Sequence, residues 1–273
     1  MKKQVVLLLI AFLALNIQAQ KLKGNKIVTI EERELDPFYG VLVSGNLKVN
    51  IAQKESGKAI IETDENLHEA IETRVVDGIL EVELIQKIYR KKVLNISINV
   101  TNEIEYIETR DKATLTGTSE IRTDSLSLLA KGNSKMNLSI STEKLLVNGQ
   151  DRSTMRLNVE NHADLDINLV NHAEVFMQVT SEAVFVDISN DSSLRINGNA
   201  NDLMIFSIDN SNFKGKDFLV DFAKIDATNK SDTTVNVAKE LSISAVDKSE
   251  IYIYGEPVYF IDKFIDKAIL YRK

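Results

Sequence analysis

The sequence predicts an all-β protein, a right-handed parallel β-helix (β-solenoid) with coils of about 19 residues. Three observations predict it. A short phrase recurs eight times at nearly constant spacing, apolar residues alternate on both sides of each phrase, and proline is missing from the repeats. Such a unit cannot bury its apolar side alone, but it can when it is stacked on copies of itself.

Each recurring phrase is centred on a small residue, as in "IDATNKSDTTVNV" from Ile225 and "ISAVDKSEIYIY" from Ile243. Successive centres are 18 to 21 residues apart. They are Ala113, Ser134, Ser153, Ala173, Ser192, Ser211, Ser231 and Ser249. We expect these residues at an inward corner, where stacked coils leave little space.

Two further columns predict a strand, a tight turn and a second strand in every coil. Two positions before each centre stands a residue that tolerates a positive φ. These are Asp111, Gly132, Asp151, Asn171, Asn190, Asp209, Asn229 and Asp247. Six positions before each centre stands an aliphatic residue, typical of a half-buried strand. These are Ile107, Leu128, Val147, Ile167, Val186, Ile205, Ile225 and Ile243.

Proline occurs only at Pro37 and Pro257, so it is absent from all eight recurring phrases. This fits parallel ladders, which need every backbone N–H group. The leucine-rich repeat has a similar period, but its Leu-x-x-Leu-x-Leu-x-x-Asn signature is absent.

Residues 34–258 are predicted to form one β-helical domain, with a strand-rich part at 34–100 and eight regular coils at 101–258. Asp77-Gly78, between two alternating runs, predicts a hairpin. "NLHEAI" predicts one short helical turn. Because an unpaired sheet edge invites aggregation, we expect the strand-rich part to cap the first coil and residues 259–273 to cap the last. Residues 20–33 are an N-terminal lead.

The opening "MKKQVVLLLIAFLALNIQAQ" predicts a signal peptide at residues 1–19. Its apolar run is short for a membrane span; a signal anchor is the alternative. The sequence contains no cysteine, which excludes a lipidated cysteine and disulfides. We expect an exported protein of the periplasm or cell surface that is not a lipoprotein and has no transmembrane segment after signal removal.

The formal net charge of −7 and the absence of tryptophan argue against nucleic acid as a partner. His68, His162 and His172 show no spacing typical of a metal site. Asp166 and Asp187 lie on adjacent coils and are the acids to consider for calcium binding or acid–base work, against a solvated acidic face as the alternative. We expect no catalytic residue, no metal and no cofactor.

The outward columns contain large apolar residues that a solvated sheet face does not normally collect. They are Tyr106, Leu129, Leu146, Phe185, Met204 and Phe206. We interpret them as a contact patch for a partner or another copy; the alternative is that the N-terminal part or the tail covers them. Arg156, Arg195 and Lys214 share another outward column and are candidate contacts for an anionic glycan, unless they only neutralise nearby acids.

Three segments, "FYGVLVSGNLKVNI", "ENLHEAIETRVVDGILEVEL" and "VLNISINVTNEIEYIETRDKATLTG", resemble the head GIN domain family (DUF2807), typical of exported proteins of Bacteroidota. The resemblance spans roughly residues 34–258. It implies a β-helical fold, export and an adhesin role, and it brings no catalytic residue. The tail after Pro257 departs from the family, because it is apolar and charged where a glycine-rich stretch is expected.

The sequence therefore predicts an exported, non-catalytic β-helical module of the cell envelope, an adhesin-like binding head. The expected partner is a protein or glycan at the envelope, and self-association is a further expectation. Two alternatives stay open: a carbohydrate-active β-helix enzyme, and a periplasmic structural protein that polymerises end to end.

Overall fold

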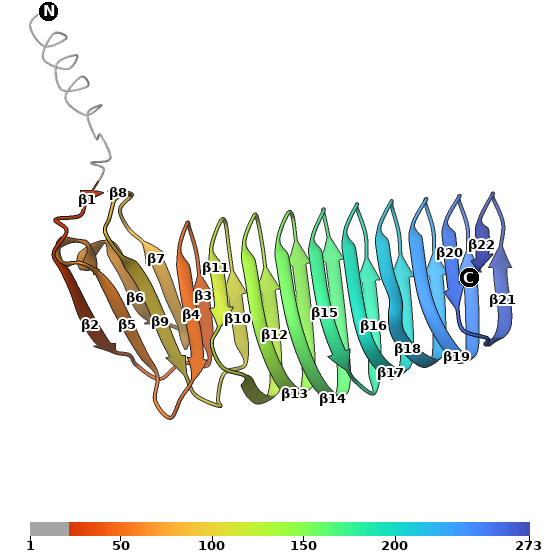
Figure 1. Ribbon diagram of the computed structural model, residues 1–273, viewed down its shortest axis with the longest axis horizontal. Helices are drawn as coiled ribbons and strands as arrows, with labels where there is room; N and C mark the ends of the chain where they lie inside the picture. Colours follow the sequence, from red (N-terminus) through yellow and green to blue (C-terminus); the bar gives the residue numbers. More distant parts are fainter. Residues whose placement is uncertain (1–21) are drawn as a thin grey trace, which may run out of the picture.

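The computed structural model describes residues 22–273, and it is a β-solenoid of about nine turns with 68% of the chain in strands. The coils stack along one long axis and give the molecule the shape of a rod (Figure 1). The fold class predicted from the repeat is confirmed. The predicted signal peptide, residues 1–19, lies outside the described residues.

Each regular coil has one strand before a tight turn and one strand after it, and both pair in parallel with the next coil. The first of these strands are β10 (Tyr106–Thr109) and β11 (Thr114–Gly117). Next come β12 (Ile121–Ala130), β13 (Lys135–Gln150), β14 (Thr154–Val170), β15 (Glu174–Thr180), β16 (Ala183–Ile188), β17 (Ser193–Ser207), β18 (Asn212–Ala227), β19 (Asp232–Ala245) and β20 (Glu250–Tyr254). Equivalent positions stack on one another, as Val147, Ile167 and Val186 do.

The core is a set of aliphatic columns that run through the stacked coils. All eight residues of the predicted aliphatic column are buried, with at most 1% of each exposed. Burying one side chain of this size contributes about 1.5–3 kcal/mol. Since each side chain packs against the same column in the coils before and after it, the coils support one another.

The tight turns have the backbone that the sequence predicts. All eight residues of the turn column have a positive φ, between 51° and 71°. The N–H of the small residue that follows closes the turn, as in the 3.2 Å bond from Ser231 to the Thr228 carbonyl. All eight small residues are buried, which confirms the inward corner. A further bond, from Lys230 N to the Asp247 carbonyl at 2.9 Å, links one turn to the next coil.

The strand-rich N-terminal part supplies the first coil, β3 (Gly40–Val43) and β4 (Lys48–Gln53), and then closes the end of the rod. Three strands and a 3₁₀ helix are built into that end: β2 (Val28–Glu34), β5 (Lys58–Asp64), β6 (Ile71–Val76) and η1 (Glu65–Ala70). β7 (Ile79–Leu84) and β9 (Leu94–Val100) link them to the first coil, while β1 (Leu22–Lys23) pairs with β8 (Ile88–Arg90). The hairpin at Asp77-Gly78 and the short helical turn are both present.

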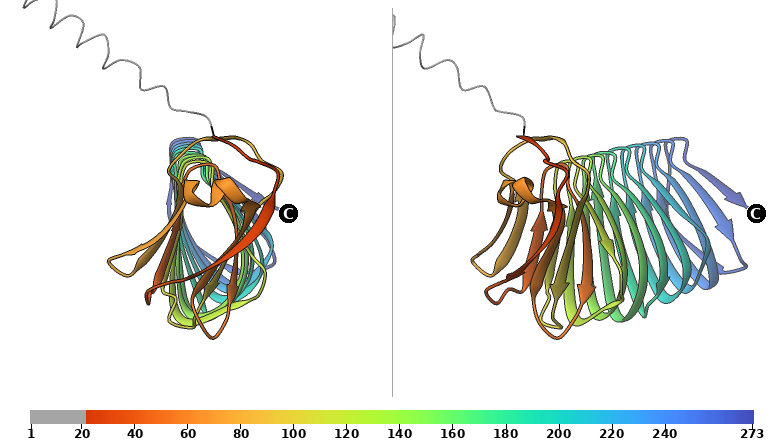
Figure 2. Two further views of the ribbon diagram at one scale, coloured as in Figure 1. Left: turned by 90° about the vertical axis from the view of Figure 1, so that its left-hand side faces the viewer. Right: turned by 60° about the vertical axis from the view of Figure 1, so that its left-hand side comes forward.

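Antiparallel pairing and η1 end the parallel stack at the N-terminal side. β2 pairs antiparallel with β5, and β5 pairs antiparallel with β9. Figure 2 shows η1 at this end of the solenoid, where Leu67 and Ala70 are buried. The Arg33 guanidinium donates to the carbonyls of His68 and Ile71 at 2.9 and 2.7 Å, which fastens η1 to β2.

The tail covers the eighth regular coil by forming one more coil. β21 (Val258–Phe264) pairs in parallel with β19, and β22 (Ile269–Arg272) with β20. Asp266 and Lys267 repeat the positive-φ turn, and Ala268 follows Ser249 at the repeat distance. Side chains of this last layer stay exposed, as Ile261 does at 58%.

Ile205→Asp tests the core column. Ile205 is fully buried between Val186 and Ile225, so the new carboxylate has no partner, and we expect a loss of at least about 4 kcal/mol in the free energy of unfolding. Urea denaturation measures it. Asn199→Asp, which adds a carboxylate at an exposed position, should change little. An unchanged melting temperature for Ile205→Asp would contradict its inward placement.

Ser231→Ala and Ser134→Ala form a matched pair at the inward corner. Ser231 Oγ is buried with no hydrogen-bond partner among residues 22–273, so its removal should stabilise the protein by about 1 kcal/mol. Ser134 Oγ is also buried but accepts from Thr109 Oγ1 at 2.9 Å, so its removal should cost about 1 kcal/mol. Thermal and urea unfolding measure both; shifts in the same direction would refute the pairing argument.

Candidate functional site

The outward side of the strands before the turn carries a groove lined by aromatic and sulfur-containing side chains. In one column Phe185 pairs with Met204, followed on successive coils by Lys224, Ser242 and Phe260. Phe222 lies beside this column and lines the same cavity, which measures about 440 Å³. We call Phe185, Met204, Phe222 and Phe260 the aromatic groove. Phe185, Phe222 and Phe260 are 42%, 39% and 50% exposed.

The predicted contact patch falls into two parts in the structure. Asp166 lies in the column between Leu146 and Phe185 and separates them. Leu146, Phe185 and Phe206 are exposed, and neither the N-terminal part nor the tail within residues 22–273 covers them. Tyr106, Leu129 and Met204 are half-buried.

Phe222 and Phe260 belong to the groove but were not predicted from the sequence. Phe222 stands nine positions before Ser231, as Asp202 and Glu240 do before Ser211 and Ser249, and this outward column was not considered in the sequence. Phe260 lies in the tail, which the sequence predicted as a cap. The repetition of Asp-Lys and a small residue at Asp266, Lys267 and Ala268 was the available signal for another coil.

Tyr106, the first residue of the predicted contact patch, takes part in a polar cluster. Its hydroxyl donates to Glu108 Oε2 at 2.5 Å, and the Arg110 guanidinium donates to the other oxygen of that carboxylate at 2.5 Å. Burial would raise the pKa of Glu108, but the hydrogen bonds from Arg110 and Tyr106, with Lys131 nearby, lower it overall. Burial and the bond to Glu108 raise the pKa of Tyr106. This pairing fixes the Tyr106 ring.

The strands after the turn carry a second groove, which contains two of the predicted cationic residues. Arg156, Phe176 and Arg195 stack on three successive coils. The two guanidinium carbons lie 4.9 and 5.7 Å from the centre of the Phe176 ring. The cavity measures about 450 Å³ and also contains amide side chains. We call it the arginine groove; its amides are Asn137, Asn158, Gln178 and Asn197.

Lys214 lies one coil beyond Arg195 in the same column, as predicted, but it does not line the arginine groove. Its charge acts on Asp232. Burial, with Glu250 nearby, raises the pKa of Asp232, and Lys214 counteracts that shift. Lys214 therefore partly has the neutralising role that was its alternative interpretation.

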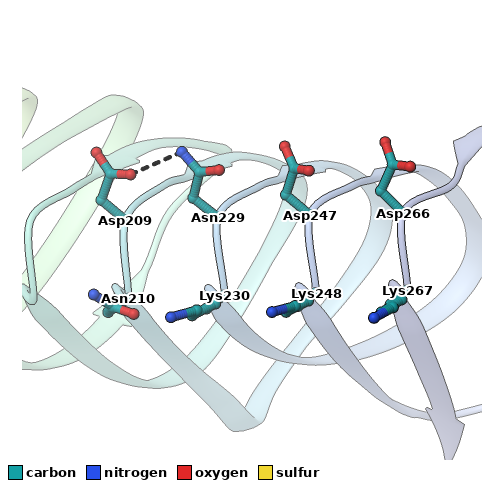
Figure 3. Close-up of a pocket in the computed structure, with 8 residues that line it drawn as sticks. All are labelled: Asp209, Asn210, Asn229, Lys230, Asp247, Lys248, Asp266 and Lys267. Atoms are coloured by element: carbon teal, nitrogen blue, oxygen red, sulfur yellow. Dashed lines mark hydrogen bonds between the residues drawn. The ribbon is translucent and has the colours of Figure 1, made fainter.

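A third cavity, of about 700 Å³, lies along the turns themselves. Figure 3 shows one row of Asp209, Asn229, Asp247 and Asp266, and a parallel row of Asn210, Lys230, Lys248 and Lys267. The Asn229 amide donates to Asp209 Oδ1 at 2.9 Å. Among the side chains of residues 22–160 and 163–273, no group of three or more acids and histidines is arranged to hold a metal ion; His162 lies outside this set.

The acids considered for catalysis do not face one another along a column. Asp166 pairs in register with Phe185, and Asp187 pairs with Phe206. His68 belongs to the N-terminal end, where its ring lies 3.0 Å from Glu31 and 2.9 Å from Thr29. His172 lies at a turn, 3.9 Å from Asp191. Asp166 and Asp187 thus lie on adjacent strands two residues out of register, and His68 and His172 lie at the N-terminal end and at a turn.

Residues 37–160 and 153–257 match the family described as "Putative auto-transporter adhesin, head GIN domain". The chain belongs to this family. The match covers the first coil, all the regular coils and both grooves apart from Phe260.

Solved structures share the fold of this GIN domain chain. A "putative adhesin" from Parabacteroides merdae is 18% identical with a TM-score of 0.68, and another from Parabacteroides distasonis is 18% identical with a TM-score of 0.69. A "putative lipid binding protein" from Parabacteroides distasonis is 12% identical with a TM-score of 0.62. Each alignment covers 93% of this chain and 100% of the other.

A search of curated proteins gives no match. Within residues 22–273, none of the helices has the length and apolar character that a membrane crossing requires.

Glu108→Gln tests the polar cluster through pH. Because folding lowers the pKa of Glu108, its contribution to stability is present above the ordinary glutamate range, about 4.3, and is lost as pH falls through the folded pKa. Between about pH 6 and about pH 3 the unsubstituted protein should therefore lose more stability than Glu108→Gln. Urea unfolding at both pH values measures this. Glu105→Gln, at an exposed site, is the control; equal acid sensitivity of all three proteins would exclude the effect.

Proposed function

We propose that this GIN domain chain is an exported, non-catalytic binding module of the cell envelope with an adhesin-like role. The observation that carries the proposal is the aromatic groove, whose large apolar side chains remain exposed on the side of the rod. Exposed apolar clusters on soluble proteins commonly mark contact surfaces. Membership of a family described as adhesin heads supports the same role.

The shape and rigidity of the groove favour a protein as its partner. Phe185, Met204, Phe222 and Phe260 project from backbone held by parallel ladders, so little conformational entropy is lost when a partner binds. Lys224, Glu240 and Asp202 line the same cavity and supply charged groups beside the aromatic rings. Aromatic side chains at the centre with polar groups around them are typical of protein interfaces.

Three features support the non-catalytic and exported parts of the proposal. Asp166 and Asp187 are each stacked against an aromatic residue, so they do not form an acid pair along a column. The turns are short, and no described loop walls off a cleft around the grooves. The predicted signal peptide at residues 1–19 and the lack of cysteine favour export without lipidation.

The two alternatives have less support. A carbohydrate-active enzyme needs clustered acids in a walled groove. End-to-end polymerisation would use an open edge on the last coil. The tail leaves such an edge, since β21 and β22 each pair with one strand only among the described residues, but antiparallel strands and η1 occupy the N-terminal end.

Phe185→Ser combined with Phe206→Ser tests the binding function. We expect at least about tenfold weaker binding to the partner found on an array of matrix and envelope proteins, because exposed aromatic anchors dominate such contacts. Both side chains point outward, so the melting temperature should change little. Surface plasmon resonance measures the affinity.

Ile27→Ser with Ile30→Ser is the matched control, since it removes exposed apolar surface, 58% and 67% exposed, from the N-terminal end. This control should bind normally. Light scattering counts the subunits. Loss of a dimer in the phenylalanine variant would identify a second copy as the occupant, and unchanged binding and subunit number would refute the proposed surface.

A further inference from the structure

The arginine groove holds two cationic side chains that have no carboxylate partner. No ion pair within the described residues involves Arg156 or Arg195, although Glu174 precedes Phe176 by two positions. By contrast, Arg33, Arg74, Arg110, Arg122 and Arg272 each pair with a glutamate. Arg90 and Arg152 also lack an ion pair within the described residues, but only Arg156 and Arg195 share a cavity and one aromatic ring.

Phe176 sets the spacing of the two charges. It lies on the coil between Arg156 and Arg195, and both guanidinium groups stack on its ring at 4.9 and 5.7 Å. This contact holds the two guanidinium groups in place and reduces the entropy lost when a ligand binds. The two residues are two coils apart, so their backbones are separated by about 10 Å along the rod axis.

An amide ladder runs beside the cations in the same cavity. Asn158, Gln178 and Asn197 stack on the same three coils, two residues beyond Arg156, Phe176 and Arg195. Each amide can donate and accept hydrogen bonds, which suits hydroxyl groups that do both. Guanidinium groups suit carboxylate or sulfate groups, which they bind with two parallel hydrogen bonds.

We infer that the arginine groove binds an extended anionic polysaccharide, with its hydroxyl groups on the amide ladder and its carboxylate or sulfate groups on Arg156 and Arg195. The inference rests on the proposed binding function and assigns a ligand class to a second surface of the same module. The amide ladder and the column of Arg156, Phe176 and Arg195 both follow the long axis of the rod. The sugar chain therefore lies parallel to that axis and crosses the coils.

The groove suits sugars better than nucleic acid. Binding of single strands relies on exposed aromatic faces on which bases stack. Phe176 is half-buried, and the guanidinium groups lie over its ring.

The first experiment is isothermal titration calorimetry on the purified chain without its predicted signal peptide. The probes are oligogalacturonate, a heparin oligosaccharide, a neutral dextran oligosaccharide and single-stranded DNA. We expect one or both anionic sugars to bind and the neutral sugar and DNA to bind much more weakly. No binding of either anionic sugar overturns the inference, and so does equal binding of the neutral sugar or of DNA.

Variants then locate the site. Arg156→Gln with Arg195→Gln should weaken binding of the anionic sugar at least about tenfold, because two charge-assisted contacts are lost. Lys230→Gln with Lys248→Gln removes the same charge from the turn row and should leave the affinity within about twofold. Equal losses in the two variants overturn the assignment, because they indicate unspecific attraction.

Asn158→Ala changes no charge and should weaken the anionic sugar about threefold, which charge attraction alone does not predict. Arg156, Arg195 and Asn158 are exposed, and melting temperatures check the fold; if the double variant unfolds, the two single arginine variants replace it.

Phe185→Ser with Phe206→Ser should bind the sugar normally. A chain that binds a protein through the aromatic groove but no anionic sugar overturns this inference alone; a chain that binds neither overturns the proposed function too.

Discussion

The structure depends on a turn that reverses the chain within two residues of left-handed backbone. Asp247 and Lys248, with φ of 52° and 63°, show it in one coil, and the same pair of angles recurs in most of the others. Residues other than Gly, Asn and Asp adopt this conformation at a cost. The stack offsets that cost, because in the five turns from Asn171 to Lys248 the N–H of the second left-handed residue bonds to a carbonyl of the next coil. Because the turn recurs at the same position of each coil, side chains that alternate along the strands line up from coil to coil. They form inward and outward columns.

Much of the fold could be predicted because the turn restricts the sequence. Only a few residue types readily accept the positive φ of the first left-handed position. The eight residues of the turn column, from Asp111 to Asp247, therefore mark every regular coil in the sequence. The N-terminal end was predicted less completely, since the antiparallel pairing of Val28–Glu34 with Lys58–Asp64 depends on contacts that leave no periodic pattern. The extra coil formed by the tail was not predicted, because Asp262 interrupts the alternation between Ile261 and Lys263, where the register shifts.

The candidate sites were predicted less well than the fold, because outward positions are under no packing constraint that a pattern can reveal. The column of Arg156 and Arg195 was predicted, whereas the role of Phe176 between them needed the register. Leu146 and Phe185 looked like one patch until Asp166 was placed between them. Phe222 lies in a further outward column, nine positions before the corner residue, beside the column of Phe185 and Met204. The register of the coils thus decides which exposed residues become neighbours.

The link from each turn to the next also bears on how such a chain evolves. A coil touches mainly the coils on either side, and its inward residues occupy the same columns as those of its neighbours. Duplication of one unit therefore lengthens the rod by one layer and leaves the N-terminal closure by η1 unchanged. Each such event also copies one outward residue into every column. Binding surfaces in this architecture can thus be extended or rewritten one layer at a time, while selection on the interior stays the same.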